Sequence, residues 1–133
     1  SAASWGEVGG LSAASQAQAE AGTADTVAIT PLSANWHNGA AKFWVTFDNN
    51  GNIHASWNIT SITDTGTGVA TITIATNFSS NYPTLAIMAA DVGLRFNNGG
   101  IYAGSFVVNC YGYNNATPTD NGTKTTVVGF GDQ

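Results

Sequence analysis

Five polar and aromatic side chains in the C-terminal third of the sequence have the chemistry to recognise a sugar. They are Arg95, Asn97, Tyr111, Tyr113 and Asn114. A sugar ring can stack its C–H face on a tyrosine ring, while an amide or guanidinium group nearby hydrogen-bonds its hydroxyl groups. We therefore predict a ligand-binding site at these five residues. The alternative interpretation is an ordinary polar turn, because Asn and Gly are also the residues that turns require.

Residues suited to catalysis or metal binding are sparse and widely spaced. His37 and His54 have no partner at the spacing of a metal site, so exposed or hydrogen-bonded histidines are expected. Asp48, Asp64 and Asp120 precede or begin turns, where a carboxylate accepts backbone hydrogen bonds, and this role explains them without glycosidase chemistry. We predict no catalytic residue, no metal site and no cofactor, and hence a protein that is not an enzyme.

The composition favours neutral partners. Only 8% of the 133 residues are charged, against about a quarter in ordinary soluble domains. Uncharged residues, mainly Thr, Asn, Ser and Gly, take their place. The net charge of −5, without a basic stripe, argues against a nucleic-acid partner and against an anionic membrane surface. No apolar run is long enough for membrane insertion. The single cysteine, Cys110, excludes an intramolecular disulfide and is expected to be a buried apolar residue.

Two regions of different character must position these residues. Residues 1–38 are rich in alanine and contain two short helical patterns, residues 13–21 with Ser12 as the cap and residues 31–35 with Pro31 in the first turn. Isolated helices of this length are marginal in water, and two of them cannot form a core. We therefore expect this region to be a helical trimerisation stem, in which copies from neighbouring chains pack around an axis.

Residues 39–133 contain short strand patterns separated by turns, which predicts a mainly β chain with an antiparallel β-sandwich. Strands are expected at residues 42–48, 53–63, 69–76, 85–90, 101–113 and 124–130, the fourth of them central in its sheet. Turns are expected at residues 49–52, 64–68 and 97–100, where Asn, Asp and Gly cluster. Trp44 and Trp57 lie on strands, and burial in the sandwich core or in a trimer interface is expected for both.

The N-terminal region resembles the repeat found in bacteriophage tail fibres. That pattern is an Ala- and Glu-rich helix followed by Ala-Gly-Thr, an acidic residue and Val-Thr-Pro. Residues 10–32 keep it as Ala21-Gly22-Thr23, Asp25 and Thr30-Pro31, with Val27 where the family often has Lys and Ile29 where Val is usual. Residues 43–47 and 58–68 resemble a domain common at the ends of phage fibres. The resemblance covers residues 10–78 well and is looser over residues 79–133.

The resemblance implies the C-terminal portion of a tail fibre protein, with a stem at residues 1–38 and a tip domain at residues 39–133. It implies a homotrimer located on the virion and therefore extracellular. Its partners would be a bacterial surface polysaccharide or outer-membrane receptor and, through the N-terminal side, other virion proteins. Two alternatives remain open: a purely structural collar, connector or head-fibre protein, and a fragment of a polysaccharide depolymerase, against which the lack of clustered carboxylates argues.

Overall fold

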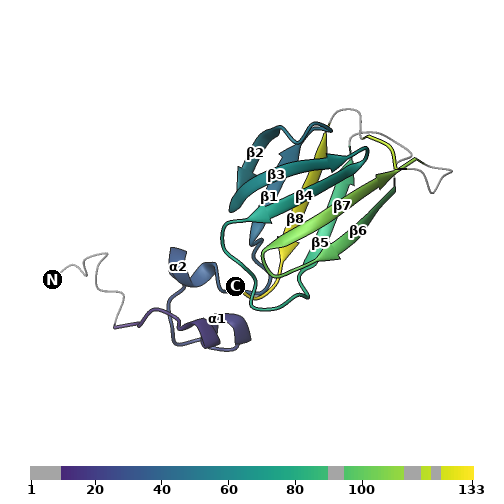
Figure 1. Ribbon diagram of the computed structural model, residues 1–133. Helices are drawn as coiled ribbons and strands as arrows, with labels where there is room; N and C mark the ends of the chain where they lie inside the picture. Colours follow the sequence, from purple (N-terminus) through teal and green to yellow (C-terminus); the bar gives the residue numbers. More distant parts are fainter. Residues whose placement is uncertain (1–9, 90–94, 113–117, 121–123) are drawn as a thin grey trace. The chain divides into compact units, whose positions relative to one another are not determined.

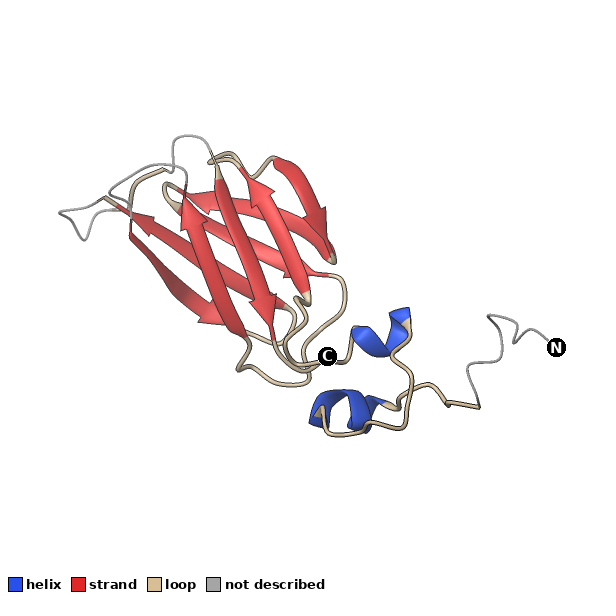
Figure 2. Cartoon of the chain, turned by 180° about the vertical axis from the view of Figure 1, so that it is seen from behind, coloured by secondary structure: helices blue, strands red, loops and turns tan. Residues whose placement is uncertain are grey.

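The computed structural model describes residues 10–89, 95–112, 118–120 and 124–133. The chain divides into two compact units, the N-terminal unit, which ends at Ala40, and the β unit, Ala41–Gln133. Strands dominate the chain, and the only helices in the described residues are two short ones (Figures 1 and 2). Neither of these helices is long and apolar enough to cross a membrane.

The first helix of the N-terminal unit, α1 (Gln16–Ala21), begins later than the sequence predicts. Ser15, not Ser12, caps it, because the Ser15 hydroxyl accepts the Gln18 N–H at 3.3 Å and the Gln18 side chain accepts the Ser15 N–H at 3.0 Å. The Ser12 carbonyl accepts the Ala28 N–H instead, in an extended bridge that keeps this segment out of the helix. The second helix, α2 (Pro31–Ala34), begins after Thr30 as the sequence predicts.

Among the described residues of the N-terminal unit, the buried side chains are small and the leucine and isoleucine side chains are exposed, while Val27 is half-buried. Buried among its described residues are Ala14, Ala19 and Ser33. Ile29 and Leu32 are 62% and 64% exposed, and Leu11 is exposed as well. Burial of apolar surface is the main driving force for folding, so this unit gains little of it from its own side chains.

The β unit consists of two antiparallel four-stranded sheets, with strand orders β2-β1-β8-β5 and β3-β4-β7-β6. The strands are β1 (Phe43–Phe47), β2 (Ile53–Trp57), β3 (Ile59–Gly66), β4 (Val69–Ile74), β5 (Thr84–Ala89), β6 (Arg95–Ile101), β7 (Ser105–Tyr111) and β8 (Thr125–Phe130). The prediction of a mainly β chain with antiparallel sheets is confirmed.

The two sheets share one hydrophobic core, which makes the architecture sandwich-like. Phe43, Val45 and Phe47 alternate into this core from β1, as the period-two pattern predicts. The ring of Phe106, from β7, stacks on that of Phe43 at a centroid distance of 5.0 Å. Phe78, from the segment between β4 and β5, meets both rings edge-on at 6.2 Å. Three distant parts of the chain therefore meet in one aromatic cluster.

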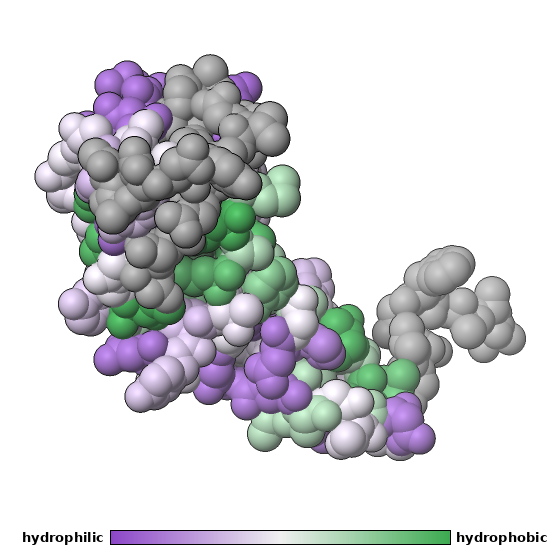
Figure 3. Space-filling model, turned by 90° about the vertical axis from the view of Figure 1, so that its right-hand side faces the viewer, coloured by the Kyte–Doolittle hydropathy of each residue, from purple (hydrophilic) through white to green (hydrophobic). Residues whose placement is uncertain are grey.

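Three predictions of strands and turns are wrong. The strand expected at residues 53–63 is two strands in different sheets, β2 and β3, which separate at Asn58 with φ +58°. The segment expected as a central strand forms β5, which pairs only with β8 and lies at the edge of its sheet. The view onto the side with β5 and β6 shows hydrophobic side chains at the surface (Figure 3), and Leu85, Ile87 and Ile101 are only partly buried against the core. The turn expected at residues 97–100 lies inside β6, and the chain reverses at residues 102–104, where the Tyr102 N–H donates to the Ser105 carbonyl at 2.9 Å.

Candidate functional site

The chain enters β1 and leaves β8 at the same end of the β unit. Phe43 pairs with Gly129, and the Lys42 N–H donates to the Gly129 carbonyl at 2.7 Å. The opposite end, which we call the turn end, carries residues 48–52, the β3–β4 connection and residues 118–120 (Figure 1). It is therefore the end of the β unit farthest from its attachment to the preceding chain.

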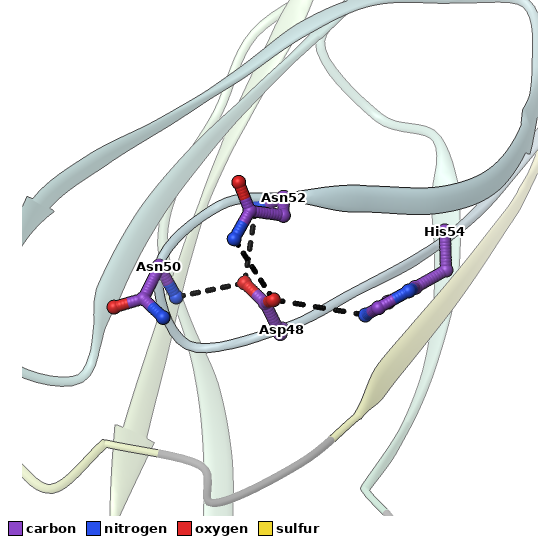
Figure 4. Close-up of polar contacts among 4 residues, drawn as sticks. All are labelled: Asp48, Asn50, Asn52 and His54. Atoms are coloured by element: carbon purple, nitrogen blue, oxygen red, sulfur yellow. Dashed lines mark hydrogen bonds and ion pairs between the residues drawn. The ribbon is translucent and has the colours of Figure 1, made fainter.

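Asp48 holds the β1–β2 turn together (Figure 4). One carboxylate oxygen accepts the N–H groups of Asn50 and Asn52 at 2.9 and 3.0 Å. The other accepts the Asn52 side-chain amide at 3.0 Å and lies 3.7 Å from the His54 ring. The Asn52 side-chain hydrogen bond, with help from the backbone bonds and from the charge of His54, lowers the pKa of Asp48 below its usual value. Asp64 also closes a turn, accepting the Gly66 N–H at 3.0 Å, so the structural role predicted for these carboxylates is confirmed.

The lowered pKa of Asp48 predicts a specific dependence of stability on pH. A carboxyl group whose pKa is lower in the folded state stabilises that state above its unfolded pKa, and the contribution is lost as the pH falls through the folded pKa. The thermal midpoint of Asp48→Asn should therefore lie below that of the wild type at pH 7, and the gap should close below about pH 3.8. Thermal melts from pH 7 to pH 2 measure this. Since both proteins share every other carboxylate, a gap that stays constant down to pH 2 would contradict the prediction.

The β3–β4 connection is tied to the chain that follows β7. Gly68 donates its N–H to the Asp120 carboxylate at 2.6 Å and accepts the Cys110 N–H at 2.7 Å. The Thr119 N–H donates to the Cys110 carbonyl at 3.0 Å. Gly68 has φ +68°, and a Cβ atom there would lie 2.7 Å from the Cys110 carbonyl oxygen and from Thr119 backbone atoms. Only glycine fits this position without strain, so the turn end is a closely packed backbone junction.

A small cavity of about 30 Å³ lies between the sheets at the turn end. Its lining includes Asp48, Asp120 and Cys110. Cys110 is buried, as the sequence predicts. A space of this size holds about two water molecules. Because Asp48 and Asp120 use carboxylate oxygens to hold backbone N–H groups, their observed role is to close the turn end.

The structure brings together some of the five predicted ligand-binding residues. Arg95 on β6 is directly opposite Tyr111 on β7, and Asn97 is opposite Asn109. Tyr111 is half-buried and forms an isolated bridge with Pro118, which places it at the turn end. Tyr113 and Asn114 lie outside the described residues, as do the side chains of Arg95 and Asn97.

Two exposed tryptophans form a surface feature that the sequence did not lead us to expect. Trp44 and Trp57 are 39% and 43% exposed, so neither lies in the sandwich core, and the alternative of a trimer interface stays a prediction. The inward positions of β1 are taken by phenylalanine and valine, which leaves Trp44 on the outward face. Trp57 lies directly opposite it on the edge strand β2, all of whose residues are exposed. The alternation of β1 already carried this signal, because Trp44 is out of phase with the buried residues.

Among the described residues, no group of three or more His, Cys, Asp or Glu side chains is gathered as a metal site would require. Comparison of the chain with protein-family models, with curated proteins and with solved structures finds no match.

Proposed function

We propose that this chain is part of a bacteriophage tail fibre, forms a homotrimer, and attaches the virion to a bacterial surface glycan without catalysing a reaction. The N-terminal unit would join the three chains and connect them to other virion proteins. The β unit would be the tip domain that meets the host. Three identical sites on one fibre strengthen attachment through effective concentration, so weak contacts at each site suffice.

The observation that carries this proposal is the inverted burial of the N-terminal unit. Alanine and serine are buried, while Leu11, Ile29 and Leu32 face outward. Exposed aliphatic side chains on so short a segment favour association with another apolar surface. Identical copies around a shared axis supply that surface, as the resemblance of residues 10–32 to the fibre repeat leads us to expect.

The oligomeric state tests the trimer. The full chain should sediment at micromolar concentration with three times its mass of 13.6 kDa. Leu32→Ser should shift the species toward monomer, because it replaces an exposed aliphatic group with a polar one. Tyr82→Ser, which changes a side chain that is 90% exposed in the β unit, is the matched control and should leave the mass unchanged. A monomeric, well-folded wild-type chain would contradict the proposal.

A structural connector is the second candidate. The turn end favours it, because Asp48 and Asp120, which line the cavity there, use their carboxylates to hold backbone N–H groups. The two functions differ in their affinity for cells. A receptor-binding tip should be retained on the cells of a susceptible bacterium when the labelled full chain is mixed with a panel of strains. A trimer that no strain retains would favour the connector.

A further inference from the structure

The outward face of the sheet β2-β1-β8-β5 carries a pair of exposed tryptophans. Trp44 and Trp57 occupy directly opposed positions of the β1–β2 register. Opposed side chains in an antiparallel pair have Cβ atoms about 4.5–5.5 Å apart, so the two indoles are neighbours on one surface. In the described part of the chain no ring packs on either indole, the opposed indole included, and the aromatic contacts there join only phenylalanines of the core. The pair therefore presents open aromatic surface to solvent.

Polar groups lie next to this aromatic surface. Two residues along β1 on the same face, Thr46 lies opposite Thr126, and their hydroxyl oxygens are 3.1 Å apart. One hydroxyl donates to the other, so the pair keeps one proton and several lone pairs for a ligand. The indole N–H groups of Trp44 and Trp57 make no hydrogen bond to the described residues. The surface thus combines two aromatic rings with donors and acceptors.

The outward positions that face one another in the register of these four strands contain no ionisable side chain. They are Ala55 and Trp57 on β2, Trp44 and Thr46 on β1, Thr126, Val128 and Phe130 on β8, and Thr84, Ala86 and Met88 on β5. The one ionisable residue of the four strands, His54 on β2, lies at a shift in register, 3.7 Å from the Asp48 carboxylate. Removing a charge from water without a partner costs free energy, so a ligand that buries itself against this face should be neutral.

We infer that Trp44 and Trp57 form a binding platform for a neutral glycan, an inference that rests on the host-attachment function proposed above. A pyranose ring would lay its C–H face on the indoles, and its hydroxyl groups would accept from the indole N–H groups and pair with Thr46 and Thr126. A second copy of the chain fits this face less well, because the side-chain acceptors at its outward positions are only threonine hydroxyls, two of which already hydrogen-bond to each other. The hydroxyl-rich surface of a glycan supplies those acceptors.

The test is binding of the full chain to an array of purified bacterial surface polysaccharides, both neutral and acidic, followed by titration with the neutral ones it retains. Indole fluorescence should shift to the blue as sugar covers the rings. Trp44→Ala and Trp57→Ala should each weaken binding about tenfold or more, as expected for the loss of one aromatic contact. Trp44→Phe should fall between these variants and the wild type, because it keeps a ring but lacks the N–H. Met88→Ala is the matched control. It removes an exposed apolar side chain from the same face on β5, two strands from β1 and three from β2, and should bind as the wild type does.

Three outcomes would overturn the inference, and each differs from a failure of the proposed function. The first is retention of acidic polysaccharides alone. The second is attachment to cells that persists unchanged in Trp44→Ala and Trp57→Ala, which would leave host attachment standing and place it elsewhere. The third is a drop from trimer to monomer in both tryptophan variants, which would make the face a contact between copies. Binding of neutral glycans that depends on the tryptophans, without attachment to any cell, would support the platform and overturn host attachment.

Discussion

Phe106→Ala should lower the free energy of unfolding by about 3–5 kcal/mol, the usual cost of deleting a buried aromatic side chain. Phe106 is completely buried and lies between Phe43 and Phe78, which come from a strand of the other sheet and from the β4–β5 segment. Its loss leaves a cavity at the only place where these three segments share an aromatic contact among the described residues. Domains of this size are stable by about 5–15 kcal/mol, so the variant should lose a large share of its stability.

Chemical denaturation at one protein concentration measures this effect, because association also shifts apparent stability. Tyr82→Ala removes an aromatic side chain of similar size that is 90% exposed, and its effect should stay within about 0.5 kcal/mol. If the two variants had equal unfolding free energies, the Phe106 ring would not be part of the core.

Gly129→Ala should destabilise the β unit by about 1–3 kcal/mol or more, although it adds only a methyl group. Gly129 lies on β8 opposite Phe43, and a Cβ atom at this position would overlap the Phe43 ring. The ring cannot move away, because Phe106 and Phe78 hold it from two sides. Either the ring or the β1–β8 pairing must shift, and either shift removes packing contacts from the core.

A double-mutant cycle identifies the cause. In a Phe43→Ala background the space beside Gly129 is open, so the second substitution should cost little, and the coupling between the two sites should reach about 1 kcal/mol or more. Gly112→Ala is the matched control, because its nearest neighbour, the Thr119 hydroxyl, would be in ordinary van der Waals contact at 3.5 Å. Additive effects of Gly129→Ala and Phe43→Ala would rule out the steric explanation.

Local patterns in the sequence predict most of the strands but not their neighbours. The alternation of β1 and the Asp48 turn depend on residues close in sequence, and both are found where expected. The pairing of β1 with β8 joins residues about eighty positions apart, as in the Thr46–Thr126 contact, and no local pattern specifies it. For the same reason the edge position of β5 could not be predicted from its continuous apolar run.

Asn97-Asn98-Gly99-Gly100 shows how a turn signal can mislead. These residues lie within β6, at a shift in register between Asn98 and Gly100. A Cβ atom at Gly99 would lie 2.7 Å from the side chain of Asn109 on the neighbouring strand. Glycine is needed here for close approach of a side chain rather than for reversal of the chain. The opposition of Arg95 and Tyr111 follows from the true reversal at residues 102–104, so the sequence could suggest these residues but not bring them together.

The adjacent ends of β1 and β8 make the β unit suitable for transplantation. Because the Lys42 amide donates to the Gly129 carbonyl, the start of β1 and the end of β8 lie side by side. A segment with neighbouring ends can be spliced into a surface loop of an unrelated host protein without stretching either joint. Residues 41–133 could thus be carried as a cassette on a scaffold of known valency, and one, two or three copies could then be compared directly.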